Sequence, residues 1–125
     1  RVVGVVSALA PAYALSFAAG RAVSHEVSTR IADGVACSTP DPVALELIRA
    51  GVDRIVEVAD DEVEAAMCAL FSDTHNVAEG AGAAGLAALM QEQSAMRGKR
   101  VAIVVTGGNV DRDVYARVLV STALG

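Results

Sequence analysis

The sequence has very few aromatic residues and no tryptophan. Aromatic residues make up 3% of the 125 residues, whereas hydrophobic residues of all kinds make up 54%. The core must therefore consist of valine, leucine and above all alanine, whose small side chains let helices pack closely. A chain of this length can bury one core but not two, so we expect a single structural unit over residues 1–125.

The sequence also has no cluster of basic residues. The net charge is −5, and the ten lysine and arginine residues are scattered along the sequence. Nucleic acid and anionic lipid are recognised mainly through such basic surfaces. We therefore expect neither a nucleic-acid partner nor a membrane partner.

Cysteine and histidine are scarce, which bears on metal binding and on the compartment. Cys37 and Cys68 form no C-x-x-C pair, and neither His25 nor His75 has a second ligand at metal-binding spacing. We expect two free, buried thiols and no metal site. Free thiols are typical of a reducing compartment, so we expect the protein in the cytoplasm.

Charge is absent from a long stretch near the beginning, which superficially suggests a signal peptide or a membrane span. Residues Val2–Ala19 contain no charged side chain. However, the first part is rich in β-branched residues and the second part is rich in alanine around Pro11, which favours a buried strand followed by a helix. Because the chain begins with Arg1, we also expect it to be a piece of a longer protein.

Hydrophobic periodicity and capping signals predict three strands and five helices. The predicted strands are Val2–Val6, Arg54–Val58 and Val101–Val105. The predicted helices are Pro11–Gly20, Asp41–Ala50, Asp60–Asp73, Ala81–Met96 and Asp111–Thr122, and residues 21–40 are predicted to be a long loop. The acids of residues 60–62 are interpreted as helix-start residues that interact with the helix dipole.

Strands separated by helices predict an α/β fold with a parallel sheet between two helical layers, hence three layers. Three strands are few for such a sheet, which must be covered on both faces and continued at its edges. We expect the missing strands in polypeptide outside this sequence or in a second copy of the chain, which makes a homo-oligomer an expected assembly. The helix over residues 81–90, apolar on every side, is expected to be buried or to form a subunit interface.

The most informative motif is Val101–Asn109, an aliphatic run that stops at Thr106, Gly107 and Gly108. Ligands of open α/β sheets bind just beyond the carboxyl ends of the strands, and glycines let a ligand approach the backbone closely. The helix expected after Asn109 could direct free N–H groups at an anion. On this pattern alone, a small phosphate- or nucleotide-binding module is one interpretation.

Glu79 is the second informative residue, because it is the only carboxylate between Asp73 and Glu92. One interpretation is an N-cap for the helix that follows it. The other is a carboxylate placed beside a ligand, at the same end of the sheet as Thr106. The sequence leaves both open.

Three ordered blocks carry a resemblance to a known family. They are Ile31–Val35, Val77–Ala84 and Val105–Asp111. In this order and spacing the chain resembles the C-terminal part of the threonine dehydratase and serine racemase-like enzymes, which are fold-type II pyridoxal phosphate enzymes related to tryptophan synthase β. The resemblance implies an incomplete half of such a cofactor domain, and a small amino acid as substrate.

The resemblance also implies roles for individual residues. Thr106 takes the place of the family's hydroxyl residue that contacts the pyridine nitrogen of pyridoxal 5'-phosphate, and Gly107 lets the cofactor approach the backbone. Glu79 is similar to the glutamate beside the ring, and Gly34 to the glycine near its phenolic edge. A neutral hydroxyl cannot stabilise a protonated ring as an aspartate would, which favours β-elimination, giving a 2-oxo acid and ammonia, over transamination.

The departures from the family pattern are equally informative. The family's Ser-Phe-Lys-type segment and glycine tetrad are absent, and the only lysine, Lys99, precedes the predicted strand that Thr106 follows. At ~3.3 Å per residue the two lie roughly 20 Å apart, so Lys99 cannot form the Schiff base. Residues Ser7–Tyr13, which correspond to a cation-binding region in some relatives, contain no carboxylate. We expect an inactive fragment of a threonine or serine ammonia-lyase, with serine racemase-type activity left open.

Overall fold

The computed structural model describes residues 1–122, and the last three residues of the predicted unit, 123–125, lie outside the described residues. The elements in chain order are β1 (Val3–Ser7), α1 (Ala12–Ala19), the single 3-10 turn η1 (Asp33–Val35), α2 (Pro42–Gly51), β2 (Arg54–Val58), α3 (Asp60–Thr74), α4 (Gly80–Gln91), α5 (Gln93–Met96) and α6 (Arg112–Thr122). No helix among residues 1–122 is both long and apolar enough to cross a membrane.

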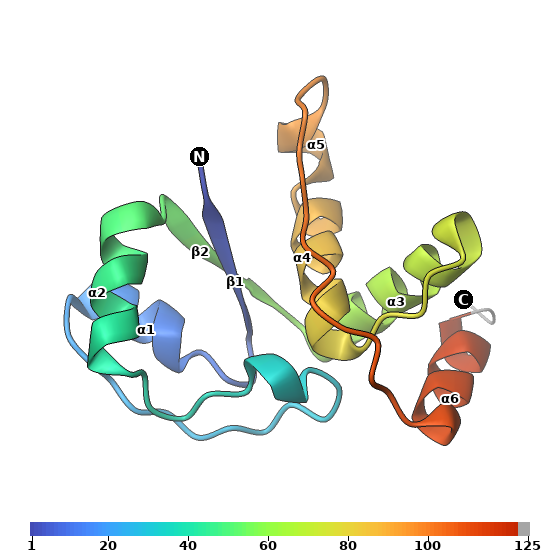
Figure 1. The fold of residues 1–125 in the computed structure, drawn as a ribbon, viewed down its shortest axis with the longest axis horizontal. Coiled ribbons are helices and arrows are strands. Elements are labelled where there is room, and N and C mark those ends of the chain that lie inside the picture. Colours follow the sequence, from blue (N-terminus) through green and yellow to red (C-terminus); the bar gives the residue numbers. More distant parts are fainter. Residues whose placement is uncertain (123–125) are drawn as a thin grey trace.

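Strands β1 and β2 form a parallel pair, as the helix between them requires. Val5 lies opposite Val56, and Ser7 opposite Val58, so both strands end at the same edge of the sheet. Helices α1 and α2 lie to one side of the strands, and α3, α4 and α6 lie to the other (Figure 1). The α/β class and the parallel pairing are confirmed.

The expectation of a third strand over Val101–Val105 is wrong for the residues that the structure describes. The sheet has two strands, and the segment runs as a trace beside α4 (Figure 1). Ile103 packs against Gly85, but Val104 is 76% exposed. A β-strand forms only where a neighbouring segment offers free backbone N–H and C=O groups. Helix α4 offers none in its interior, because those groups are already hydrogen-bonded within the helix. The sheet expected to have three strands therefore has two among the described residues.

The main core lies between β2, α3 and α4, with one contribution from α6. Its buried members are Val56, Val58, Val63, Ala66, Met67, Leu70, Ala78, Ala83, Ala84, Ala87, Ala88 and Val118. The small α4 residues let α3 pack closely, as the composition predicts. At the rim, the rings of Phe71 and Tyr115 meet edge to face with centroids 5.9 Å apart, and burial raises the pKa of Tyr115.

Local signals predict most helix ends correctly. Gly20 ends α1 with a φ of +70°, a left-handed conformation that suits glycine. The Asp41 carboxylate accepts a hydrogen bond of 2.9 Å from the Ala44 N–H and caps α2. The predicted helix over residues 81–96 is divided at Glu92 into α4 and α5.

Two burial expectations need correction. Helix α4 is not covered on every side, because Met90 is 44% exposed and Leu86 and Leu89 are only partly buried. The thiols of Cys37 and Cys68 are free, as expected, but each residue is only half-buried. Cys68 packs at the margin of the core, and Cys37 lines a cavity beside Gly34.

Candidate functional site at the first turn of α4

The first turn of α4 is the point at which three distant segments of the chain meet. The turn comprises Gly80, Ala81 and Gly82, and Glu79 stands before it at the N-cap position in extended conformation. Consecutive residues of an α-helix lie about 100° apart, so Glu79 and Gly82 share one face and Gly80 and Ala81 share the opposite face. Each face is occupied by a different segment.

The loop that contains Gly34 packs on the Gly80 and Ala81 face. A side chain at Gly80 would overlap the carbonyl oxygen of Ile31, and one at Gly34 would come within 2.8 Å of the Ala81 Cβ. Real Cβ atoms do not make contacts this close, so both positions require glycine for clearance. The loop and the helix are therefore in direct backbone contact.

The segment that follows Thr106 packs on the other face. The Glu79 N–H donates a hydrogen bond of 3.1 Å to the carbonyl of Gly107, and a side chain at Gly82 would overlap that same carbonyl oxygen. A side chain at Gly108 would approach the Val77 carbonyl oxygen to 2.6 Å. Among the described residues only Gly20 and Gly98 are glycines with positive φ, so Gly107 and Gly108 are needed for close approach and not for a left-handed backbone.

The Glu79 carboxylate lies against the α-carbon of Gly107, at the position that a side chain there would fill. Glu79 is partly exposed, and its side chain accepts no hydrogen bond from the N–H groups of α4. The interpretation of this carboxylate as a helix cap is therefore wrong, although the residue does occupy the N-cap position. Its oxygens remain available to a ligand.

Thr106 is exposed at the residue before Gly107. Consecutive α-carbons are about 3.8 Å apart, so Thr106 lies beside the same edge of α4 as the Glu79 carboxylate. Within residues 1–122 its hydroxyl has no hydrogen-bond partner. The structure therefore brings Thr106, Gly107 and Glu79 together, while Gly34 lies on the opposite face of the turn.

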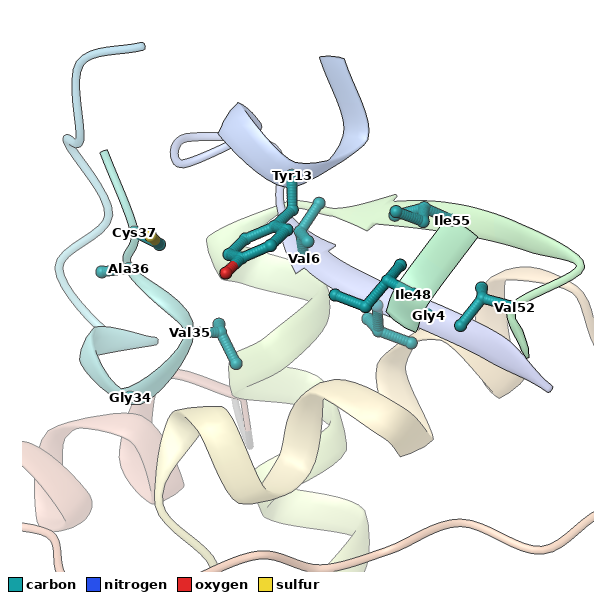
Figure 2. A pocket seen from close by; sticks show the side chains of 11 residues that line it. Gly4, Val6, Tyr13, Gly34, Val35, Ala36, Cys37, Ile48, Val52 and Ile55 are labelled. Carbon is teal, nitrogen blue, oxygen red and sulfur yellow. The ribbon is translucent and has the colours of Figure 1, made fainter. Parts of the chain in front are cut away.

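A cavity of about 290 Å³ lies beside Gly34 but does not include the other candidate residues. Figure 2 shows its side chains, which come from α1, α2, both strands and the loop after η1. Apart from the Tyr13 hydroxyl and the Cys37 thiol, the lining is aliphatic or backbone. Such a lining offers no charge to a phosphate or an amino acid, so the polar site is the edge at Glu79 and Thr106.

Sequence reasoning missed Asp60 and Thr29 as residues of this region. The Thr29 hydroxyl donates a hydrogen bond of 2.6 Å to one carboxylate oxygen of Asp60, and the Arg30 N–H donates one of 2.9 Å to the other. The sequence predicts Asp60 at a helix start, and it is the first residue of α3, but its carboxylate bonds the loop while Glu62 accepts from the Ala59 N–H. Its place just after β2, at the carboxyl edge of the sheet, was the available signal.

Lys99 lies at the far end of α4 from these residues. It follows the turn after α5, where its N–H donates to the Met96 carbonyl. The 12 residues of α4 alone span about 18 Å at 1.5 Å per residue. The expectation that Lys99 and Thr106 lie far apart agrees with this arrangement.

The family model for pyridoxal-phosphate dependent enzymes matches residues 1–107, which include Gly34, Glu79, Thr106 and Gly107. The chain belongs to this family. The L-threonine ammonia-lyase of Thermotoga maritima is 37% identical over 119 residues, which are 95% of this chain and 29% of that protein. The catabolic L-threonine dehydratase of Escherichia coli strain K12 is 35% identical over 89% of this chain and 34% of that protein.

A solved structure with a similar fold is the processed form of threonine deaminase isoform 2 from Solanum lycopersicum. It matches with a TM-score of 0.89 at 25% identity, over 100% of this chain and 35% of that one. The chain thus spans about a third of the length of the relatives that it matches.

The edge at α4 fits one part of a pyridoxal phosphate site. An exposed hydroxyl, a carboxylate that accepts no capping hydrogen bond from α4, and glycine backbone can contact a polar aromatic ring. The amine that would bind the cofactor covalently is not at this edge, because the lysine lies at the other end of α4. The described residues therefore fit ring contact and not covalent attachment.

Proposed function

We propose that this chain is the C-terminal part of the cofactor domain of a pyridoxal phosphate-dependent ammonia-lyase. The substrate would be a hydroxy amino acid such as threonine or serine, converted to a 2-oxo acid and ammonia. The observation that carries the proposal is the meeting of three segments, residues 31–34, 77–82 and 106–108, at the first turn of α4. The relatives named L-threonine ammonia-lyase and L-threonine dehydratase support threonine as the first substrate to test.

In this proposal each residue at the edge contacts the cofactor ring. Thr106 offers a neutral hydroxyl to the ring nitrogen, and a hydroxyl cannot hold a proton there as a carboxylate would. Glu79 lies beside the ring, Gly107 keeps the backbone close to it, and Gly34 leaves room at its phenolic edge. Bound pyridoxal phosphate supplies the electron sink that allows a group to leave the β-carbon of the substrate.

The proposal assigns the covalent anchor to polypeptide outside this sequence, and therefore no turnover to the 125-residue chain alone. The open segment Val101–Val105 supports this division, because its exposed valines suit a place beside further strands. Those strands would come from the rest of the polypeptide or from a second copy in a homo-oligomer. The amino acid would bind between them and the edge at α4.

The hydroxyl of Thr106 provides the sharpest test in the intact protein. Thr106→Ala should weaken pyridoxal phosphate binding and slow ammonia release from threonine, each by about tenfold, because one hydrogen bond to the ring is lost. Thr106→Ser keeps the hydroxyl and should recover most of both. Gly51→Ala, where a Cβ would meet no atom within 4 Å, should change neither. If Thr106→Ala behaves like Gly51→Ala, the ring contact is wrong.

A second test uses the 125-residue chain alone. Mixed with pyridoxal phosphate, it should release no ammonia from threonine or serine, even though the exposed amine of Lys99 can form a Schiff base with the free aldehyde as any surface lysine can. Ammonia release that Lys99→Arg abolishes would overturn the assignment of the anchor. Serine racemisation, measured in the intact protein alongside ammonia release, decides whether the parent activity is of the racemase type.

A further inference from the structure

The loop that carries Gly34 is fastened at one point to the start of α3. Both oxygens of the Asp60 carboxylate accept hydrogen bonds from the loop, one from the Thr29 hydroxyl at 2.6 Å and one from the Arg30 N–H at 2.9 Å. Each carboxylate oxygen thus has its own donor. Hydrogen bonds to an ionised acceptor are about twice as strong as those between neutral groups.

Thr29 also hydrogen-bonds the loop residues that follow it. Its hydroxyl oxygen also accepts hydrogen bonds from the Ala32 N–H at 3.2 Å and, more weakly, from the Ile31 N–H at 3.4 Å. Ala32 is fully buried. One side chain therefore holds the backbone of Ile31 and Ala32, which leads toward Gly34.

The same backbone then contacts α4. The Ile31 carbonyl oxygen packs against the α-carbon of Gly80, and Gly34 packs against Ala81. Asp60 itself is held in place because it begins α3 immediately after β2. A continuous path thus runs from the carboxyl edge of the sheet, through Asp60 and Thr29, to the first turn of α4.

We propose that Asp60 is a positioning residue, which acts through Thr29 to hold the Gly34 loop in the arrangement that admits the cofactor. The positioning role rests on the proposed function, because it assumes that pyridoxal phosphate binds at α4. The attachment of the loop to Asp60 does not depend on that assumption. Asp60 does not touch the ring in this account. Its neighbour Asp61 carries the same charge in the same helical turn, but within residues 1–122 it accepts only from the Glu62 N–H.

The attachment is tested by amide hydrogen exchange in the intact protein without cofactor. Asp60→Asn should raise the exchange rates of the Arg30, Ile31 and Ala32 amides by about tenfold, because one of the two acceptor oxygens becomes an NH2 group, which cannot accept. Thr29→Val should raise the rates of the Ile31 and Ala32 amides, and Thr29→Ser should restore them. Asp61→Asn is the matched control and should leave the loop unchanged. Unchanged exchange in Asp60→Asn overturns the attachment.

The positioning role is tested by cofactor affinity in the intact protein, compared with urea unfolding of the same variants. Asp60→Asn and Thr29→Val should weaken pyridoxal phosphate binding by about tenfold and lower kcat, with little change in the KM for the amino acid; Asp61→Asn and Thr29→Ser should do neither. Faster loop exchange without loss of cofactor affinity overturns the positioning role. A wild-type protein that binds no pyridoxal phosphate overturns the proposed function, and the exchange data still decide the attachment.

Discussion

Strand β2 and the segment Val101–Val105 are both rich in β-branched aliphatic residues but differ in structure. Three of the five residues of β2 and all five of the other segment are aliphatic, and each is followed by polar residues at a candidate site. In β2 the backbone pairs with β1 and Val58 is fully buried, whereas Val104 in the other segment is 76% exposed. An aliphatic run expresses a preference for a sheet interior, but a neighbouring strand must be present for that preference to be realised.

The largest effect is expected in the well-packed part of the molecule, where the loop that contains Gly34 lies against α4. Gly80→Ala would place a Cβ on the Ile31 carbonyl, and the backbone atoms there cannot move without displacing the loop. We expect unfolding in urea to show a loss of about 3 kcal/mol.

Gly51→Ala is the control for Gly80→Ala, because a Cβ at Gly51 would meet no atom within 4 Å. It should leave the stability unchanged or raise it by about 0.5 kcal/mol, since alanine favours a helix over glycine. Equal effects of the two substitutions would mean that the contact between the loop and α4 is absent in solution.

The second prediction compares a valine of β2 with a valine of the segment Val101–Val105. Val58→Ala should reduce the free energy of unfolding by about 2 kcal/mol, from the lost buried methyl groups and the cavity that remains. Val104→Ala should change it by less than about 0.5 kcal/mol, as is usual for an exposed position. If the intact protein is used, burial of Val104 beside further strands should raise its cost toward that of Val58. A small cost for Val104 in both forms would contradict the proposed sheet extension.

The third prediction concerns Gly107, which follows the segment Val101–Val105 and lies against the first turn of α4. Gly107→Ala would bring a Cβ against the Glu79 carboxylate, and that flexible side chain can move aside. The stability loss should therefore stay below about 1 kcal/mol. Pyridoxal phosphate affinity of the intact protein should nevertheless fall, because the carboxylate is displaced. A variant with unchanged affinity would show that Glu79 does not lie beside the ring.

The smallest effect is expected at the opposite edge of the sheet. A hydrogen bond from Arg1 holds the pKa of Asp53 below its ordinary value. A lowered carboxyl pKa stabilises the fold at pH above the ordinary value, and this contribution is lost as pH falls through the folded-state pKa. Because the pair is exposed, Asp53→Asn should cause only a slight loss at neutral pH, and none once the carboxyl is protonated. A loss that grows as the pH is lowered would contradict this assignment.

Features that depend on a few neighbouring residues were predictable from the sequence. Gly20 ends a helix and Asp41 begins one because their effects act over one turn. The sequence predicts Thr106 and Glu79 at one end of a sheet, whereas the structure places Thr106 beside the first turn of α4, next to Glu79 but not on a strand. Features that depend on distant partners were not predictable: the strand expected at Val101–Val105 lacks a neighbour, and Asp60 is bonded to a loop about 30 residues earlier.

The central claim is that the cofactor binds at the first turn of α4. Hydrogen exchange of the intact protein, measured with and without pyridoxal phosphate, tests this most directly. The account predicts that added protection concentrates in residues 31–34, 77–82 and 105–109. Protection confined to other parts of the chain, such as the aliphatic cavity around Tyr13 and Ile48, would contradict it.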